Sequence, residues 1–225
     1  MDGTETSVHE YVKLAKKYNA LTYLDEVHAV GLYGKGGRGI AFKNNVSNDV
    51  DIINGTLAKG FGQIGGYIVA DQITIDFIRS FAPGFIFTTS MMPSIAAAAT
   101  KSIEIVESLD DKRTDIFNKA KYFKQKLNLL DIPFIDSDSH IIPILTYSTK
   151  KAKLFSKLLL KQYNSYIQPI FYPTVPEGSA RLRITITPKH SIQDIDNLIT
   201  ALKRLFDSEK SEQSINTATR QNQVA

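Results

Sequence analysis

The chain has 225 residues, of which 43% are hydrophobic and 22% are charged, so it can bury a core as one large or two small domains. Its 27 basic and 23 acidic residues give a net charge of +4 without a basic cluster, which argues against a nucleic-acid groove and a basic membrane-surface patch. There is no cysteine, which excludes disulfides and thiolate metal sites, and no apolar run reaches membrane length. We therefore expect a soluble protein of a reducing compartment, the cytoplasm.

Short strands and helices alternate over residues 1–90, as in an α/β chain. Apolar residues at helical spacing predict a helix from Val8 to Ala15, and the same spacing predicts a second helix at 74–81. Short runs of apolar and β-branched residues predict strands at 21–26, 51–55, 66–70 and 84–89. We expect the ends of these strands to carry the side chains of a ligand site.

Helices dominate from Pro93 onward, and the last third alternates again. Apolar spacing predicts helices at 95–106, 116–130, 155–159 and 195–205, with strands at 140–147 and 181–187. Ser191, with Asp194 three residues later, predicts the cap of the last helix. From Asp207 the sequence loses hydrophobic periodicity and gains Ser, Gln and Asn, which predicts a disordered tail at 207–225.

Lys59 lies in a glycine-rich segment directly before a predicted strand. Glycines on both sides let the backbone approach a ligand closely, and an apolar flank disfavours a charged amine. A lysine that reacts through its neutral amine needs such surroundings. The pattern thus suits a reactive lysine beside a flat cofactor, and the alternative is a surface lysine between turn glycines.

Acidic residues end the first predicted strand, in the stretch DEVH at 25–28. Because ligands bind at the carboxyl ends of strands in α/β proteins, Asp25 is a candidate to hold a protonated ring nitrogen, with His28 in the following turn. The alternative is that Asp25 and Glu26 form a solvated strand end and His28 is a turn residue. The spacing is not that of the helical HExxH zinc site and no second histidine cluster accompanies it, so we expect no metal site.

Hydroxyl and guanidinium side chains supply two further candidate contacts. Thr88, Thr89 and Ser90 precede a predicted helix, and hydroxyls and amides at a helix start bind phosphate, although they also form ordinary caps. Arg181 and Arg183 alternate along a strand and therefore share one face. An arginine there can bind a carboxylate through two hydrogen bonds, and the alternative is that both arginines are solvated.

Five segments carry a resemblance to known enzymes: YLDEVHAVGLYG, DIINGTLAKGFGQIGGYI, FIFTTS, SHIIPI and YPTVPEGSARLRIT. In this order and spacing they resemble the α-oxoamine synthases, which are pyridoxal-phosphate enzymes of fold type I, over residues 8–206. FIFTTS, SHIIPI and YPTVP are most similar to the family branch that condenses glycine with succinyl-CoA to 5-aminolevulinate. A sibling branch that uses another acyl-CoA is the alternative.

The resemblance implies a role for each candidate residue. Lys59 matches the lysine that binds pyridoxal phosphate and then removes a proton from glycine as general base. Asp25 matches the aspartate that keeps the ring nitrogen protonated, and His28 the histidine on the phenolic oxygen of the ring. The other matches are phosphate contacts at Thr56, Thr88 and Thr89, the last two toward the neighbouring subunit of a homodimer, and substrate-carboxylate contacts at Thr174 and Arg183, with Arg181 as second choice.

The resemblance also sets expectations for the fold. Family chains are longer, and this chain matches their C-terminal half. We therefore expect an α/β remnant of the large parallel-sheet, cofactor-binding domain at 1–105, a smaller α/β domain at 106–206 and the tail at 207–225. The remaining half would carry early strands and much of the acyl-CoA site. A separately encoded N-terminal half is thus a candidate partner, and an inert product of a truncated or split gene is the alternative.

Overall fold

The computed structural model describes residues 1–222 and divides the chain into two compact units. The N-terminal unit is Thr6–Arg113, and the C-terminal unit is the chain from Thr114 onward together with Met1–Glu5. Residues 223–225 of the predicted tail lie outside the described residues. The domain limits expected at 105/106 and 206/207 stay predictions.

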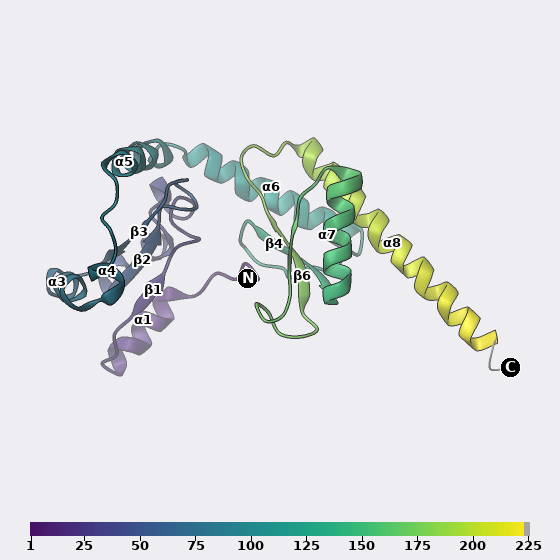
Figure 1. Ribbon diagram of the computed structural model, residues 1–225, viewed down its shortest axis with the longest axis horizontal. Coiled ribbons are helices and arrows are strands. Elements are labelled where there is room, and N and C mark those ends of the chain that lie inside the picture. The colour runs from purple at the N-terminus through teal and green to yellow at the C-terminus, as the bar shows by residue number, and fades with distance from the viewer. Residues whose placement is uncertain (223–225) are drawn as a thin grey trace. The chain divides into compact units, whose positions relative to one another are not determined.

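The N-terminal unit contains a three-stranded sheet in the order β1-β2-β3 (Figure 1). Strand β1 (Tyr23–Asp25) runs parallel to β2 (Ile52–Thr56), and β2 runs antiparallel to β3 (Gly66–Val69). Since Asp25 pairs with Asn54 in the register, β1 and β2 end at the same edge of the sheet. The strands predicted at 21–26, 51–55 and 66–70 are confirmed.

The helices of the N-terminal unit begin at recognisable start signals. Helix α3 begins after Asp71, whose carboxylate accepts a hydrogen bond from the backbone N–H of Thr74 at 2.9 Å. Helices α4 and α5 have proline in their first turn, where its missing N–H costs no helical hydrogen bond. The helices are α1 (Val8–Lys17), α2 (Ile40–Lys43), α3 (Gln72–Phe81), α4 (Pro83–Ile86) and α5 (Pro93–Glu107), with short 3₁₀ turns at Lys35–Gly37 and Ser47–Asp49.

The strand predicted at 84–89 is wrong, because this segment begins as the helical turn α4. The backbone N–H groups of Phe85 and Ile86 both donate to the carbonyl of Ala82. Proline at position 83 fixes a φ suited to the first helical residue, and the Thr88 hydroxyl donates back to the Gly84 carbonyl. The apolar run therefore forms a turn rather than pairing with a neighbouring strand.

The C-terminal unit packs helices on an antiparallel sheet in the order β4-β6-β5, in which β4 and β6 are labelled in Figure 1. Helix α7 packs against all three strands and against α8. Helix α6 (Asp110–Leu129) begins in the N-terminal unit and continues into this one. The other elements are β4 (Ile141–Tyr147), α7 (Thr149–Tyr163), β5 (Gln168–Ile170), β6 (Ala180–Thr185) and α8 (Ile192–Asn222). The helices and strands predicted from Pro93 onward are confirmed, and β5 was not predicted.

One hydrophobic core joins the elements of the C-terminal unit. Helices and strands contribute to it alike, and several of its large side chains are fully buried: Phe123, Leu127, Ile142, Ile144, Leu159, Leu182 and Leu202. Alternate residues of β6, Leu182 and Ile184, face this core, which leaves Arg181 and Arg183 on the opposite face.

Helix α8 extends past the point where the sequence analysis places a disordered tail. The helix is anchored in the core by Leu202, Leu205 and Phe206 and continues to Asn222, so the structure differs from the prediction over 207–222. The segment after Phe206 includes Glu, Lys and Gln, which propagate a helix already begun although they lack apolar periodicity. Neither α8 nor another helix within residues 1–222 has the length and apolar character needed to cross a membrane.

Candidate functional site

Asp25 ends β1 at the edge of the sheet where β2 also ends. Its side chain is exposed, and its Oδ1 accepts a hydrogen bond from the backbone N–H of Val27 at 3.0 Å. This bond orients the carboxylate at the start of the turn that carries His28, which is also exposed. The predicted position of Asp25 at a strand end is confirmed, and both side chains are accessible to a ligand.

Glu26, next to Asp25, has a different environment. Its side chain is 2% exposed, and its two carboxylate oxygens accept the backbone N–H groups of Ile40 at 2.7 Å and Ala41 at 2.8 Å. Burial raises the pKa of Glu26, and these two hydrogen bonds oppose the rise. The alternative of a solvated Asp25–Glu26 strand end is therefore wrong for Glu26, which fixes the turn after β1 to the start of α2.

The Lys59 loop, residues 57–65, follows β2 and closes on itself through backbone hydrogen bonds. Leu57 is buried, its N–H donates to the Gly65 carbonyl at 2.9 Å, and its carbonyl accepts the N–H of Gln63 at 2.7 Å. The Thr56 hydroxyl donates to the Gly65 carbonyl at 3.2 Å and accepts the N–H of Ala58 at 3.1 Å. These bonds leave Lys59 exposed at the turn of a defined loop.

The Lys59 loop packs directly on the turn after β1 through two glycines. A Cβ atom added to Gly60 would lie 2.8 Å from the carbonyl oxygen of Val30, and one added to Gly31 would lie 3.2 Å from the Cα of Gly60. The first distance is shorter than a real Cβ contact and the second is tighter than an ordinary one, so the close approach of the two backbones favours glycine at both positions. The contact brings the segment with Lys59 beside the turn with Asp25 and His28.

Thr88 and Thr89 lie in the same unit, and within residues 1–222 no hydrogen bond joins either of them to the Lys59 loop. Both are exposed, and the Thr88 hydroxyl donates to the carbonyl of Gly84 within its own turn. The chain then approaches the loop at Met91, because a Cβ on Gly65 would lie 2.6 Å from the Met91 methyl carbon. The two threonines are thus available for a contact outside this unit.

The two arginines of β6 differ sharply in their surroundings. Arg181 is 6% exposed, and its Nε donates to the Ser179 carbonyl at 3.0 Å. Arg183 is half-buried, and its buried Nε has no hydrogen-bond partner among the described residues. Burial lowers the pKa of Arg183. The alternative in which both arginines are solvated is therefore wrong, and the buried Nε of Arg183 is a donor left for a ligand.

Arg183 lines a cavity of about 460 Å³ in the C-terminal unit. The other lining residues are Asn164–Gln168, Ile184–Ile186, His190, Asp194, Ile195 and Leu198. Thr174, the other predicted carboxylate contact, is exposed in a turn where its N–H donates to the Phe171 carbonyl at 3.0 Å. Lys59 and Asp25 belong to the N-terminal unit, whereas Thr174 and Arg183 belong to the C-terminal unit.

The structure adds two residues that the sequence analysis did not identify. Glu26 holds the turn with His28, and the Ser102 hydroxyl on α5 donates to the carbonyl of Phe61 in the Lys59 loop at 2.6 Å. Each contact joins residues far apart in the chain, so no local pattern could have revealed it. Together they fix the turn that carries His28 and the loop that carries Lys59.

Known proteins match this chain over nearly all its length. It is 48% identical over 207 residues to the 5-aminolevulinate synthase of Rickettsia prowazekii, an alignment that covers 92% of this chain and 50% of the relative. The serine palmitoyltransferase of Sphingomonas wittichii superposes with a TM-score of 0.86 at 26% identity, covering 92% of this chain and 52% of that one. A serine palmitoyltransferase solved with its PLP internal aldimine superposes with a TM-score of 0.84 at 25% identity, covering 92% of this chain and 54% of that one.

The matches define the fold and family of the chain. The chain spans about half the length of the curated relatives it matches. The superpositions confirm the expected partial fold type I architecture, with part of the large sheet domain followed by a smaller α/β region. The model of the aminotransferase class I and II family matches residues 1–202, and the chain therefore belongs to that family.

Proposed function

We propose that this chain is the lysine-bearing half of a 5-aminolevulinate synthase, an acyltransferase that condenses glycine with succinyl-CoA to 5-aminolevulinate, coenzyme A and carbon dioxide in tetrapyrrole synthesis. The identity of 48% to the Rickettsia enzyme supports the choice of reaction. The single structural observation that supports it is the contact of Gly60 with Val30 and Gly31, which sets the Lys59 segment beside the Asp25–His28 turn.

The residues at this edge fit pyridoxal phosphate. When bound, the cofactor supplies an electron-accepting ring that stabilises negative charge on the carbon next to the substrate amine. The exposed Asp25 carboxylate would hold a protonated ring nitrogen, and His28 would hydrogen-bond the phenolic oxygen. Lys59 would bind the cofactor covalently and move the proton at the glycine α-carbon. The glycine backbones leave room for the flat ring on this side of the loop.

Thr56, Thr88 and Thr89 are the proposed phosphate contacts, and Thr56 must first give up a hydrogen bond that it already makes. Its hydroxyl already donates to the Gly65 carbonyl, so it can donate to a phosphate only by exchanging that hydrogen bond. Thr88 and Thr89 are exposed and would reach the phosphate of the neighbouring subunit in a homodimer. Their position, outside the hydrogen bonds of the Lys59 loop, supports a contact made between subunits.

Arg183 would bind the carboxylate of glycine, and Thr174 would contribute a second contact. The unpartnered Nε of Arg183 supports this role, because a buried guanidinium gains most from a carboxylate that accepts two hydrogen bonds. The contact of Arg181 with the Ser179 carbonyl supports Arg183 over Arg181 for this role.

A separately encoded N-terminal half is the proposed partner of this chain. Apolar side chains on α3 are exposed, with Ile73 at 83% and Phe77 at 62%, as expected of a surface that another part of the family fold covers. We also propose the cytoplasmic location expected from the sequence.

The test is titration of the purified chain with pyridoxal phosphate, followed by visible absorption and by borohydride trapping with peptide mapping. We expect a band that saturates and a label on Lys59. Lys59→Ala should lose both, whereas Lys101→Ala, which removes an exposed lysine of α5 that pairs with Glu104, should keep both. Asp25→Asn should bind the cofactor but lose the ring-nitrogen proton, which would appear as an altered band and lost turnover in a complemented assembly.

An inert fragment is the second candidate, and the exposed apolar residues of α3 favour it for the chain by itself. A missing band at every cofactor concentration would support the inert fragment. Turnover of alanine or of longer acyl-CoA thioesters in preference to glycine and succinyl-CoA would instead support a sibling α-oxoamine synthase.

A further inference from the structure

Three glycine backbones lie in contact, one on the next, in the N-terminal unit. The series begins at Gly60, which touches Gly31 as described above. A Cβ added to Gly37 would in turn lie 2.9 Å from the Cα and carbonyl carbon of Gly31, and the Gly31 N–H donates to the Gly37 carbonyl at 2.7 Å. Gly31 and Gly37 have φ of +86° and +72°, which side chains other than glycine rarely adopt. The position of the Lys59 loop is thus set through Gly31 by the loop that carries Gly37.

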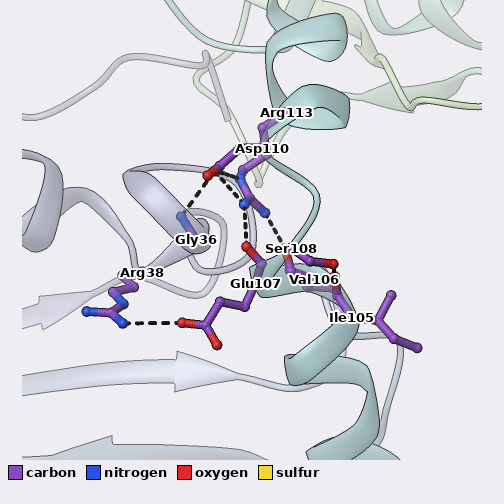
Figure 2. A network of polar contacts seen from close by, with 8 residues as sticks. All are labelled: Gly36, Arg38, Ile105, Val106, Glu107, Ser108, Asp110 and Arg113. Carbon is purple, nitrogen blue, oxygen red and sulfur yellow. Dashed lines mark hydrogen bonds and ion pairs between the residues drawn. The ribbon is translucent and has the colours of Figure 1, made fainter.

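The loop with Gly37 is tethered by Asp110 at the start of α6 (Figure 2). The Gly36 N–H donates to Asp110 Oδ1 at 3.1 Å. Arg113 donates to the same oxygen from Nε at 3.0 Å and from Nη2 at 2.6 Å. The single carboxylate oxygen thus joins the glycine loop to Arg113, and these charge-assisted bonds hold the pKa of Asp110 below its ordinary value, chiefly through Arg113.

Arg113 is itself fixed to the end of α5. It is 6% exposed, and its Nη1 donates to the Val106 carbonyl at 2.6 Å while Nη2 also donates to the Glu107 carbonyl at 3.2 Å (Figure 2). Val106 and Glu107 lie at the end of α5, where the Val106 carbonyl also accepts the N–H of Leu109 at 3.1 Å, so the guanidinium adds side-chain hydrogen bonds to the last turn of the helix. A buried, multiply bonded arginine is a rigid support, unlike the exposed Arg38–Glu107 ion pair beside it.

Helix α5 therefore reaches the Lys59 loop by two routes. Ser102 holds the Phe61 carbonyl directly, and the end of the helix acts through Arg113, Asp110 and the glycine contacts. Leu57 is buried and Phe61 is half-buried, whereas residues 58–60 and Ile64 are exposed, so the loop has little apolar anchoring. Its position depends on these polar and backbone contacts more than on a core.

We propose that Asp110 and Arg113 are positioning residues for Lys59, acting through the contacts of Gly36–Gly37 with Gly31 and of Gly31 with Gly60. The expected effect on cofactor binding rests on the function proposed above, since Lys59 must present its amine at a fixed place to hold the cofactor. Neither residue is among the proposed cofactor and substrate contacts.

The test compares Asp110→Ala, Asp110→Asn and the control Glu104→Ala in the full chain. Asp110 and Glu104 form similar ion pairs, each three residues from its basic partner, with side chains 55% and 57% exposed. Asp110→Ala removes the shared acceptor, whereas Asp110→Asn keeps an oxygen that can accept from Gly36 and Arg113. Hydrogen–deuterium exchange of peptides covering 27–33 and 57–63 reports the position of the loop without cofactor, and a pyridoxal-phosphate titration reports its consequence.

We expect Asp110→Ala to speed exchange in both peptides and to weaken pyridoxal-phosphate binding by about tenfold, the loss expected for one charge-assisted hydrogen bond. Asp110→Asn should keep exchange and pyridoxal-phosphate binding close to those of the wild-type chain. Glu104→Ala should change neither. Faster exchange at 34–39 with unchanged exchange at 57–63 would overturn the proposal, as would an Asp110→Asn variant that behaves like Asp110→Ala. Wild-type chain without a cofactor band would count against the proposed function alone, because the exchange measurement needs no cofactor.

Discussion

The two units hold their elements together in different ways. In the C-terminal unit, large side chains such as Phe123, Leu127 and Leu202 are fully buried in one continuous core. In the N-terminal unit, the contacts that fix the loops are backbone approaches at glycine and buried polar groups such as Glu26, while Phe77 on α3 remains 62% exposed. The unit that carries Lys59 therefore depends less on its own apolar burial than the unit that carries Arg183.

The difference matters for function because loops held by polar contacts open more easily than core elements do. A cofactor that joins Lys59 and Asp25 would add its binding energy to the less well packed unit, since a ligand stabilises the state that binds it. Arg183, on a central strand over a closed core, needs no such help to keep its place.

The largest effect is expected for Phe123→Ala in the core of the C-terminal unit. Phe123 is fully buried among residues of α6, α7, α8 and the sheet, so its truncation leaves a cavity and should lower the free energy of unfolding by about 3–5 kcal/mol. Phe77→Ala is the matched change in the N-terminal unit, where the exposed ring should cost about 0.5 kcal/mol or less. Urea unfolding of each variant measures both values, and equal losses would contradict the contrast.

A smaller but still large effect is expected for Glu26→Ala in the N-terminal unit. The change leaves the buried N–H groups of Ile40 and Ala41 without their carboxylate partner, which should cost about 2–4 kcal/mol. Glu26→Gln keeps one acceptor oxygen and should cost less. Unfolding followed by a probe within residues 6–113 measures these losses.

The same carboxylate gives a pH dependence of known sign. Because burial raises the pKa of folded Glu26, the folded state holds the proton more tightly than the unfolded state. The free energy of unfolding should therefore fall as the pH rises from the ordinary glutamate pKa to the raised folded value. Glu26→Gln should abolish this slope, and a slope that survives in the variant would show that another group causes it.

The elements of both units could be predicted from local pattern more readily than their contacts. Apolar spacing located α6, which buries Ile116, Ala120, Phe123 and Leu127 on one face, and short apolar runs located β1, β2, β4 and β6. The run at 84–89 misled because aromatic and β-branched residues favour a strand only where another strand pairs with them, whereas the proline at 83 starts a helical turn. The continuation of α8 was missed because helix propagation needs no apolar face.

In the candidate site, too, the residues follow from local sequence features whereas the contacts that hold them do not. Asp25 and Lys59 were found from their places at a strand end and among glycines, which are local features. The burial of Glu26 beside an exposed Asp25 could not be found, because it depends on backbone N–H groups fourteen and fifteen residues away. The contact of Gly60 with Gly31 and the tether at Asp110 join still more distant segments, so local patterns indicate the candidate residues but not the contacts that position them.

The smallest effect is expected for Ser191→Ala at the start of α8, where a polar contact stands beside a full core. The Ser191 Oγ accepts the Asp194 N–H at 3.1 Å, and the Asp194 carboxylate accepts the Ser191 N–H at 2.8 Å and hydroxyl at 2.7 Å, which confirms the predicted cap. Losing the hydroxyl should lower the free energy of unfolding by about 1 kcal/mol, and Gln193→Ala in the same turn should lower it by about 0.5 kcal/mol or less.

The same cap has a pH dependence. The Ser191 hydrogen bonds hold the pKa of Asp194 below its ordinary value, so the stabilisation by Asp194 is present above the ordinary aspartate pKa and is lost as the pH falls through the lowered value. Thermal unfolding at neutral and acid pH measures both effects, and a Ser191→Ala loss as large as that of Glu26→Ala would mean that polar contacts matter equally in the two units.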